Sequence, residues 1–269
     1  MNIAILGVTG MLGSAVYKYF RENTKYTVIG TKRTTQLDSE FFILDALTDC
    51  MPSSTFLKLA NSDYIINCIG VIKPAFKEIG IKNAIKINSL FPYKLAELFD
   101  NKVINISTDC VYSGNKGQYI ESDLHDALDD YGKTKSLGVA TVNSMVLRTS
   151  IIGEEINHNY SLISWVKSQK DKEVKGFINH LWNGLTTTQY AKCCHKIIEN
   201  NLYKSGLYHI FSDTHSKYEM LNMFNNKWNL NLKIEATKAI NDCDRTLDSI
   251  KDLNDKLNIP MLAKQLEEI

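Results

Sequence analysis

The chain has 269 residues, of which 44% are hydrophobic, and it carries 31 basic against 30 acidic side chains. A chain of this length can form one large domain, or one domain with a small appendage, and its balanced charge argues against binding a nucleic acid polymer. No apolar run approaches the length of a membrane span, and the first residues, MNIAILGVTG, lack the features of a signal peptide. We therefore expect a cytoplasmic protein without membrane contact.

The cysteines and histidines do not indicate a metal site. The six cysteines lack the spacing of metal ligands and are Cys50, Cys68, Cys110, Cys193, Cys194 and Cys243. In a chain this long they indicate reduced thiols that mostly pack in the interior. The six histidines are not clustered either, so we predict no bound metal.

Short apolar segments alternate with amphipathic ones through the first half of the chain. The apolar segments are residues 2–6, 26–31, 41–45, 63–69, 102–107 and 145–149, and helical patterns cover residues 11–21, 84–99 and 131–142. Apolar runs that are separated by helices are typical of parallel strands buried on both faces. The pattern predicts an α/β fold of the Rossmann type, with a doubly wound parallel sheet.

This alternation becomes less regular in the second half. Helical patterns cover residues 161–169, 188–200 and 217–228, and strand patterns cover residues 207–211 and 232–237. We predict a Rossmann domain over residues 1–153, with a sheet completed by later elements, and a smaller C-terminal lobe over residues 154–269. Because open α/β sheets bind ligands at the carboxyl ends of their strands, we expect the lobe to cover that edge and bind the substrate.

Three glycines, Gly7, Gly10 and Gly13, separate the first strand from the first helix in the sequence IAILGVTGMLGSAV. Glycine at these points permits a tight turn, a close approach of backbone to a pyrophosphate, and close packing of helix on strand. The helix N-terminus would face the phosphates with its N–H groups. An ordinary βα turn is the alternative. The predicted dinucleotide-binding residues of this loop are Gly7, Thr9, Gly10, Met11, Leu12 and Gly13.

The residues after the second strand predict which dinucleotide binds. Sites that prefer NAD usually carry a carboxylate there for the ribose 2′-hydroxyl, whereas this chain has Lys32 and Arg33. Their charges suit a 2′-phosphate, so we predict NADP(H) and regard NAD(H) as disfavoured. Two solvated loop charges are the alternative. Asp45 closes the third strand and is placed to contact the adenine ring.

Tyr131 and Lys135 begin the third predicted helix and are four positions apart, so their side chains lie one turn apart on one face. An ammonium group there would lower the pKa of the phenol, which could then exchange a proton with a substrate carbonyl or alcohol. Ser107 or Thr108, at the end of the fifth strand, could hold the same oxygen. With a nicotinamide at the same edge, this pattern indicates hydride transfer.

The chain resembles the extended short-chain dehydrogenase/reductase family, and within it the dTDP-4-dehydrorhamnose reductases and related sugar-nucleotide reductases. The resemblance is carried by GVTGMLG, NCIG, INSLFP, STDCVYSG, YIESD, YGKTKSLG and LRTSIIG, and more weakly by NGLTT, SGLYHI and DRTLDS. It implies NADPH-dependent reduction of the 4-keto group of a nucleoside-diphosphate 4-keto-6-deoxy sugar. It also implies a homodimer.

The resemblance implies roles for individual residues. Thr108, Tyr131 and Lys135 would be the catalytic triad. The cofactor side of the cleft would contain Tyr131 and Lys135 with Asn67, Cys68, Gly70 and Asn88. The substrate side would contain Lys73, Thr108, Asp109, Arg148, Thr149, Ser150, Asn183, Gly184, Thr186, Thr187 and Arg245.

Cys110 follows Ser-Thr-Asp, where 4-dehydrorhamnose reductases typically have an aromatic residue. The position resembles that of the acid/base cysteine of bifunctional 3,5-epimerase/4-reductases such as the UDP-rhamnose synthases. A 4-keto group acidifies C3–H and C5–H, so a thiol and a second base could invert these carbons before reduction. A small buried hydrophobic residue is the alternative. The candidates for the second base are His158, Lys167, Lys175 and His180.

Other functions of the same fold stay open. A sugar-nucleotide C4-epimerase would use the same triad. A 4,6-dehydratase is disfavoured, because it would need an acidic pair where this chain has Asp109 and Cys110. A non-catalytic, NADP-binding regulatory subunit, such as that of methionine adenosyltransferase, is disfavoured by the intact triad. The sequence does not decide between dTDP, UDP and GDP.

Overall fold

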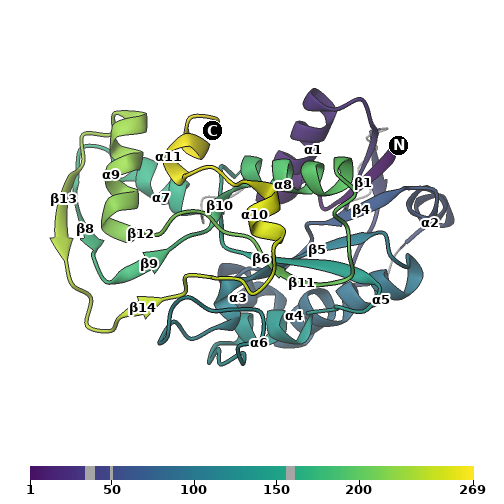
Figure 1. The fold of residues 1–269 in the computed structure, drawn as a ribbon, viewed down its shortest axis with the longest axis horizontal. Helices are drawn as coiled ribbons and strands as arrows, with labels where there is room; N and C mark the ends of the chain where they lie inside the picture. Colours follow the sequence, from purple (N-terminus) through teal and green to yellow (C-terminus); the bar gives the residue numbers. More distant parts are fainter. Residues whose placement is uncertain (34–39, 49–50, 156–160) are drawn as a thin grey trace.

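The computed structural model describes residues 1–33, 40–48, 51–155 and 161–269. Its centre is a seven-stranded parallel sheet (Figure 1), which confirms the predicted α/β doubly wound fold. The strands lie in the order β11-β6-β5-β4-β1-β2-β3. Their bounds are Asn2–Leu6 (β1), Thr27–Lys32 (β2), Phe41–Ile43 (β3), Tyr64–Asn67 (β4), Val103–Thr108 (β5), Ser144–Thr149 (β6) and Gly206–His209 (β11).

The central strands contribute side chains to a hydrophobic core on each face of the sheet. In β1, Ile3 and Ile5 pack into one core, whereas Ala4 and Leu6 pack into the other, and all four are fully buried. Because both faces of β1 are buried, apolar and polar residues do not alternate in its sequence. Helices α1 (Met11–Asn23) and α8 (Thr187–Glu199) cover the first core, and α10 (Leu253–Leu257) closes one end of it.

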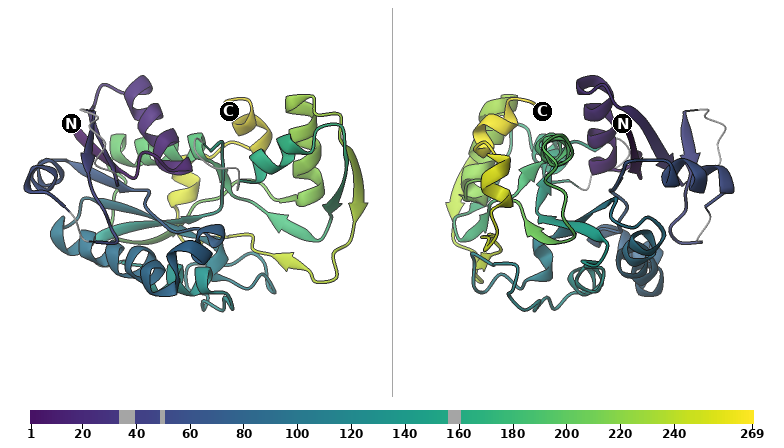
Figure 2. Two further views of the ribbon diagram at one scale, coloured as in Figure 1. Left: turned by 180° about the vertical axis from the view of Figure 1, so that it is seen from behind. Right: turned by 45° about the vertical axis from the view of Figure 1, so that its right-hand side comes forward.

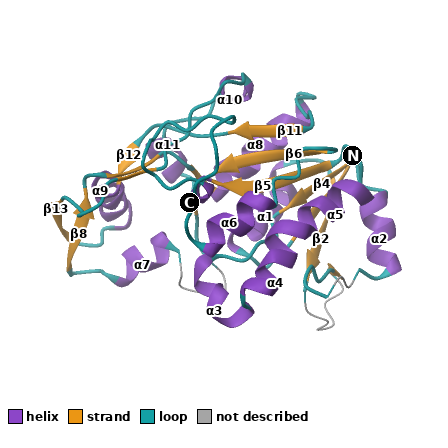
Figure 3. Ribbon diagram, turned by 90° about the horizontal axis from the view of Figure 1, so that it is seen from below, coloured by secondary structure: helices purple, strands orange, loops and turns teal. Residues whose placement is uncertain are grey.

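The second face is covered by helices that lie on the viewer's side of the sheet in Figure 3. A single helix was predicted over residues 84–99, but a π-helical turn divides it at Asn88. Pro92 explains this break, because it cannot donate a hydrogen bond to the Asn88 carbonyl four residues earlier. The helices of this face are α2 (Ser53–Ala60), η1 (Lys73–Ala75), α3 (Phe76–Ile79), α4 (Ile81–Ile85), η2 (Lys86–Leu90), α5 (Phe91–Leu98) and α6 (Asp130–Leu137).

The C-terminal lobe lies at the end of the molecule opposite the N-terminal strands, as Figure 2 shows. It has its own hydrophobic core around Trp182, Met220 and Phe224. Short strands pair as β10 with β7, as β13 with β8, and as β12-β9-β14. The 3-10 turn η3 (Asp109–Val111) follows β5. The elements of the lobe are β7 (Ile151–Ile152), α7 (Leu162–Ser168), β8 (Glu173–Phe177), β9 (His180–Trp182), β10 (Leu185–Thr186), β12 (His215–Ser216), α9 (Lys217–Trp228), β13 (Lys233–Thr237), β14 (Cys243–Asp244) and α11 (Leu262–Leu266).

The two predicted parts share elements. Strand β11 pairs with β6 at the edge of the central sheet, and α8 packs against its first core, although both come late in the chain. The predicted boundary at residue 153 therefore stays a prediction. No helix among the described residues is long and apolar enough to cross a membrane. Within the same residues, no group of three or more His, Cys, Asp or Glu side chains could hold a metal ion.

Candidate active site

The glycine loop joins β1 to α1 at the carboxyl end of the strand. Gly7 has a φ of 81°, in the left-handed region that favours glycine. A Cβ atom on Gly13 would lie 2.1 Å from the Gly7 carbonyl oxygen, so only glycine permits the helix to approach the loop this closely. Gly10 is the exposed N-cap of α1 and provides no side-chain cap. The helix N-terminus is therefore suited to binding a phosphate.

The other residues of the loop differ in what they can offer a ligand. Thr9 is exposed and Met11 is half-buried, whereas the Leu12 side chain is packed in the first core. Leu12 can therefore contact a ligand only through its backbone. The N–H groups of a first helical turn have no partner inside the helix, which makes this contact chemically suitable.

Two basic residues stand at the carboxyl end of β2. Lys32 is 9% exposed and its Nζ lies 5.8 Å from the centre of an aromatic ring, whereas Arg33 is exposed. Asp45 uses its carboxylate in its own turn, because Oδ1 accepts a hydrogen bond from Leu47 N at 2.9 Å. Arg33 is thus the more accessible of the two cations, and the predicted contact of Asp45 with adenine would have to coexist with this turn.

The end of β4 is held by buried polar contacts. The Asn67 amide donates to Asn105 Oδ1 at 2.8 Å, across to β5. The Cys68 thiol packs against the first core, and burial raises its pKa. Both side chains therefore make contacts in the interior of the protein. A cofactor could still contact the backbone of these two residues.

Gly70 and Asn88 connect the end of β4 to helix α6. The Asn88 amide donates to Val71 O at 3.0 Å and to Thr134 Oγ1 at 3.1 Å, and its Oδ1 accepts from Val71 N at 2.8 Å. A Cβ atom on Gly70 would lie 3.5 Å from Asn88 Oδ1 and 3.8 Å from Lys135 Nζ. The absence of a side chain at Gly70 leaves room for a ligand beside Lys135.

Thr108, Tyr131 and Lys135 meet at the carboxyl end of β5. The N-cap of α6 is Asp129, whose side chain accepts a hydrogen bond from Gly132 N at 2.7 Å. One turn into this helix, Lys135 is buried and its Nζ donates to Ile106 O at 3.0 Å in β5. Burial lowers the pKa of Lys135 to about 8. The strand therefore fixes the ammonium group in the site.

The pKa of Tyr131 differs from the prediction. Burial raises it, Cys110, Asp109 and Asp129 add to the rise, and a hydrogen bond with Thr108 opposes it. The prediction of a lowered pKa is wrong for the protein without ligands, because Lys135 is bound to a backbone carbonyl and the cleft desolvates the phenol. A phenol with a raised pKa is protonated at neutral pH, so it can donate a proton.

Cys110 lies beside the same hydroxyl group, since its N–H donates to Thr108 Oγ1 at 3.2 Å. Burial and the charge of Asp109 raise the pKa of this thiol to about 12, although Lys73 and Arg245 act in the opposite direction. The Lys73 ammonium pairs with Asp129 at 2.7 Å and lies 5.8 Å from the centre of the Tyr131 ring. Cys110 is therefore a protonated thiol next to the catalytic trio.

Arg148 lies in a buried network rather than at the surface of the cleft. Its guanidinium group donates to Tyr112 OH at 2.6 Å and contacts Nε2 of His209 at 3.1 Å and Nε2 of His125 at 2.7 Å. His125 Nδ1 in turn contacts Ser136 Oγ at 2.6 Å, on the catalytic helix. Because arginine only donates, both Nε2 atoms accept, so each neutral ring carries its proton on Nδ1. We predicted neither histidine.

Four other predicted substrate residues stabilise the lobe. The Asn183 amide brackets Leu247, donating to its carbonyl at 2.8 Å and accepting from its N–H at 3.0 Å. Thr186 is the N-cap of α8, and its hydroxyl accepts from Gln189 N at 3.1 Å. A Cβ atom on Gly184 would lie 2.2 Å from the Ser150 carbonyl oxygen, so this contact needs glycine. Direct contacts of these side chains with a substrate stay predictions.

Thr149, Thr187 and Arg245 complete the predicted set. The Thr149 hydroxyl donates to Ser150 O at 3.1 Å, and the Thr187 side chain packs against Gly153. Arg245 is half-buried; its Nε donates to Tyr112 O at 2.8 Å. Arg245 thus links the late part of the lobe to the segment after Cys110.

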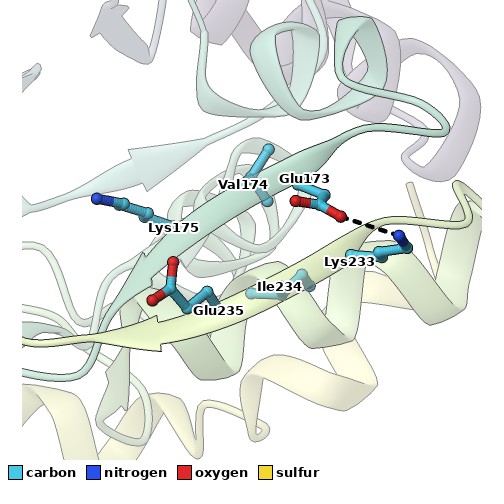
Figure 4. A pocket seen from close by; sticks show the side chains of 6 residues that line it. All are labelled: Glu173, Val174, Lys175, Lys233, Ile234 and Glu235. Atoms are coloured by element: carbon cyan, nitrogen blue, oxygen red, sulfur yellow. Dashed lines mark hydrogen bonds and ion pairs between the residues drawn. The ribbon is translucent and has the colours of Figure 1, made fainter.

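The candidates for a second base have other surroundings. Lys167 pairs with Glu154, and His180 Nε2 contacts Asn241 O at 3.1 Å. Lys175 lines a hollow on strands β8 and β13, at the outer side of the lobe (Figure 4). His158 lies outside the described residues. None of the three described candidates is shown to contact Cys110.

Lys217, which we did not predict, interacts electrostatically with Asp109 and Cys110. It is the first residue of α9, and burial lowers its pKa while Asp109, Cys243 and Cys110 act in the opposite direction. A signal was present in the sequence: Ser216 and Glu219 form a capping box, and a cation directly after the N-cap opposes the helix dipole.

Similar solved structures share this fold. A dTDP-4-dehydrorhamnose reductase from Clostridium acetobutylicum is 20% identical, with a TM-score of 0.77 over 100% of this chain and 98% of that chain. The dTDP-4-dehydrorhamnose reductase of Bacillus anthracis, solved in complex with NADP, is 19% identical, with a TM-score of 0.76 over 99% and 97% of the two chains. A variant of the UDP-glucuronic acid 4-epimerase of Bacillus cereus, solved with a UDP-sugar and NAD, is 16% identical, with a TM-score of 0.75 over 99% and 97%.

Comparison with curated sequences and families defines the relationship further. The methionine adenosyltransferase 2 subunit beta of Danio rerio is 26% identical over 234 residues, which cover 81% of this chain and 71% of that protein. The family model described as the RmlD substrate binding domain matches residues 1–258. The sequence motifs, the sheet order and this match agree, and the chain belongs to the RmlD substrate binding domain family.

Proposed function

We propose that this protein is an NADPH-dependent reductase of the 4-keto group of a nucleoside-diphosphate 4-keto-6-deoxy sugar. The observation that carries the proposal is the meeting of Thr108, Tyr131 and Lys135 at the carboxyl edge of the sheet. The glycine loop adjoins them, because Gly7 contacts the side chain of Ile69, whose neighbour Gly70 adjoins Lys135. The match to the RmlD substrate binding domain supports the same class of reaction.

The proposed proton transfer uses groups of the chain itself. Bound NADPH would supply the hydride that reduces the carbonyl carbon. Tyr131 would donate its proton to the carbonyl oxygen, and Thr108, whose hydroxyl group lowers the pKa of the phenol, would hold the same oxygen. The Lys135 ammonium would stabilise the phenolate left behind, once the ligand draws it from the Ile106 carbonyl.

NADP is the proposed cofactor. Arg33 is exposed at the end of β2 and Lys32 precedes it, which suits a 2′-phosphate. The glycine loop fits a pyrophosphate, because the N-cap of α1 is an exposed glycine with no side-chain cap. The reductase of Bacillus anthracis, which shares the fold, was solved with NADP.

An epimerase step through Cys110 stays a hypothesis. With a pKa raised to about 12, the thiol is protonated at neutral pH. It could therefore deliver a proton to C3 or C5 of a keto sugar, but it would need help from the bound substrate to remove one. We accordingly treat reduction as the main proposal and epimerisation as an additional property of the same site.

A regulatory subunit is the second candidate function. The curated relative at 26% identity is subunit beta of methionine adenosyltransferase 2, which favours this alternative. The catalytic trio argues for an enzyme, since all three side chains meet in one site. The two candidates differ in whether bound NADPH is consumed.

The test is a screen of dTDP-, UDP- and GDP-linked 4-keto-6-deoxy sugars with NADPH, followed by the absorbance of the nicotinamide and by NMR of the product. The proposal predicts consumption of NADPH and a new hydroxyl group at C4 with at least one nucleotide. Tight NADPH binding without turnover of any keto sugar would favour the regulatory subunit.

A further inference from the structure

The small sheet β12-β9-β14 carries two cations of the lobe on the same face. Lys217 directly follows β12, which pairs antiparallel with β9, and Arg245 directly follows β14, which pairs parallel with the other edge of β9. Lys217 Nζ lies 5.8 Å from the centre of the Trp182 ring, at the end of β9. Both residues therefore leave the same short sheet, one on each side of its central strand.

Arg245 contacts the segment after β5, and the charge of Lys217 interacts with the beginning of the same segment. Arg245 donates from Nε to Tyr112 O at 2.8 Å and from its NH2 group to Ser113 O at 3.1 Å, just after Cys110. The Lys217 ammonium lies within electrostatic reach of Asp109, Cys110 and Arg245, since each of these groups shifts its pKa. The lobe thus presents two positive charges beside the catalytic site.

Lys217 stands where a cation is unfavourable for the protein alone. It is the first residue of a 12-residue helix, whose N-terminus carries partial positive charge. Burial lowers the pKa of Lys217 and the charge of Arg245 lowers it further, although the Asp109 carboxylate acts in the opposite direction. In the part of the chain that the structure describes, its Nζ has no ion pair, and its closest polar contact is Met220 Sδ at 4.0 Å. A residue whose charge opposes its local environment, such as a lysine at a helix N-terminus, often has a functional role.

We propose that Lys217 is a binding residue that, together with Arg245, holds an oxyanion of the substrate beside Cys110. An oxyanion between the two cations would relieve their repulsion and satisfy the half-buried ammonium group. The inference rests on the proposed function, since it assumes that a nucleotide sugar occupies this cleft. The oxyanion is either the diphosphate of the nucleotide or a carboxylate on the sugar.

The test compares Lys217→Met with Lys227→Met by calorimetric titration of the full-length protein. Both substitutions keep the aliphatic stem and remove the charge, and each lysine lies 5.8 Å from a tryptophan ring at opposite ends of α9. The ligands are UDP, dTDP, GDP, UDP-glucose and UDP-glucuronic acid, with NADPH present. Thermal unfolding of each variant without ligand controls for damage to the fold.

Lys217→Met should weaken binding about ten- to a hundredfold, the range for a charge-assisted hydrogen bond, while Lys227→Met should change it less than about twofold. An equal loss for every ligand that the wild type binds identifies the diphosphate, and a loss confined to UDP-glucuronic acid identifies the carboxylate. If the wild type binds these ligands and Lys217→Met binds them as tightly, the Lys217 proposal is wrong and the proposed function stands. If the wild type binds none of them, both are wrong.

Discussion

Tyr131 and Lys135 show how a short motif depends on its surroundings at the scale of single residues. Their spacing correctly suggested that both belong to one face of a helix, at the strand end that carries Thr108. Their protonation could not be predicted in the same way. It depends on burial and on the Ile106 carbonyl, which lies 29 positions from Lys135 in the sequence.

Tyr131→Phe tests the proton donor. The variant keeps the ring but cannot supply a proton, so turnover of the keto sugar should fall by about a hundredfold or more. NADPH binding should remain nearly unchanged, because the glycine loop and β2 are untouched. Steady-state kinetics and a binding titration measure the two effects, and wild-type turnover by the variant would show that Tyr131 is not the acid.

Replacing both Lys32 and Arg33 with Ala tests the choice of cofactor. A charge-assisted contact with the 2′-phosphate contributes about 1.5–3 kcal/mol, so affinity for NADPH should fall about ten- to a hundredfold. Affinity for NADH should stay the same, which makes NADH the internal control in the titration. Equal binding of both cofactors by the wild type would mean that these residues are ordinary loop charges.

Cys110→Ser tests the epimerase hypothesis. In D2O without NADPH, the wild type should incorporate deuterium at C3 or C5 of the keto sugar, and the variant should not, because serine is a much weaker acid than a thiol. The variant should still oxidise NADPH with a sugar that is already epimerised. NMR of the recovered substrate gives the result, and absence of deuterium with the wild type would assign Cys110 to packing.

At the scale of elements, the Arg148 network joins strands β6 and β11 to the catalytic helix. Arg148 comes from β6, His209 from β11, and His125 from the loop that precedes α6. Burial, with the Arg148 charge as the next cause, lowers the pKa of both histidines to about 4. The neutral imidazoles are therefore part of how these elements are held together.

This network predicts a loss of stability in mild acid. Each histidine has a pKa of about 6.5 in the unfolded chain and about 4 in the folded protein. The unfolded state therefore binds more protons between these values, and the free energy of unfolding should fall as the pH drops from about 6.5 to 4.

We expect a loss on the order of 2 kcal/mol, a value reduced to allow for the coupling of the two rings and the partial exposure of His125. Urea unfolding at a series of pH values measures it. His125→Gln can keep an acceptor for Arg148 and a donor for Ser136 without titrating, so the slope should flatten. An unchanged slope in this variant would contradict the assignment.

The strands of the central sheet were predictable, because buried parallel strands appear as apolar runs without alternation. Their positions agree with the structure to within a few residues. The strands β7, β9, β10, β12 and β14 of the lobe were not predicted, since each has only two or three residues and no period that could be recognised. The contacts of Lys217 could not be predicted for the same reason, because they depend on three of these short strands.

At the scale of the whole molecule, the central sheet carries the glycine loop and the proposed catalytic residues, and the lobe contributes two cations. Strand β14 leads into Arg245, which contacts the Tyr112 carbonyl, and β12 leads into Lys217, whose pKa responds to the charges of Asp109 and Cys110. A nucleotide sugar would thus contact both parts. This arrangement agrees with the expectation that a ligand binds at the carboxyl edge of an open α/β sheet.

Transfer of deuterium is the most direct test of the central claim that the protein is a reductase. NADPH deuterated at nicotinamide C4, in both stereochemical forms, is incubated with the keto sugar nucleotide that gives turnover, and the product is examined by NMR. The account predicts deuterium on C4 of the sugar from one of the two forms, at a rate that Tyr131→Phe greatly reduces. A wild-type protein that binds NADPH and the nucleotide sugar, yet transfers no deuterium with any of them, would contradict it.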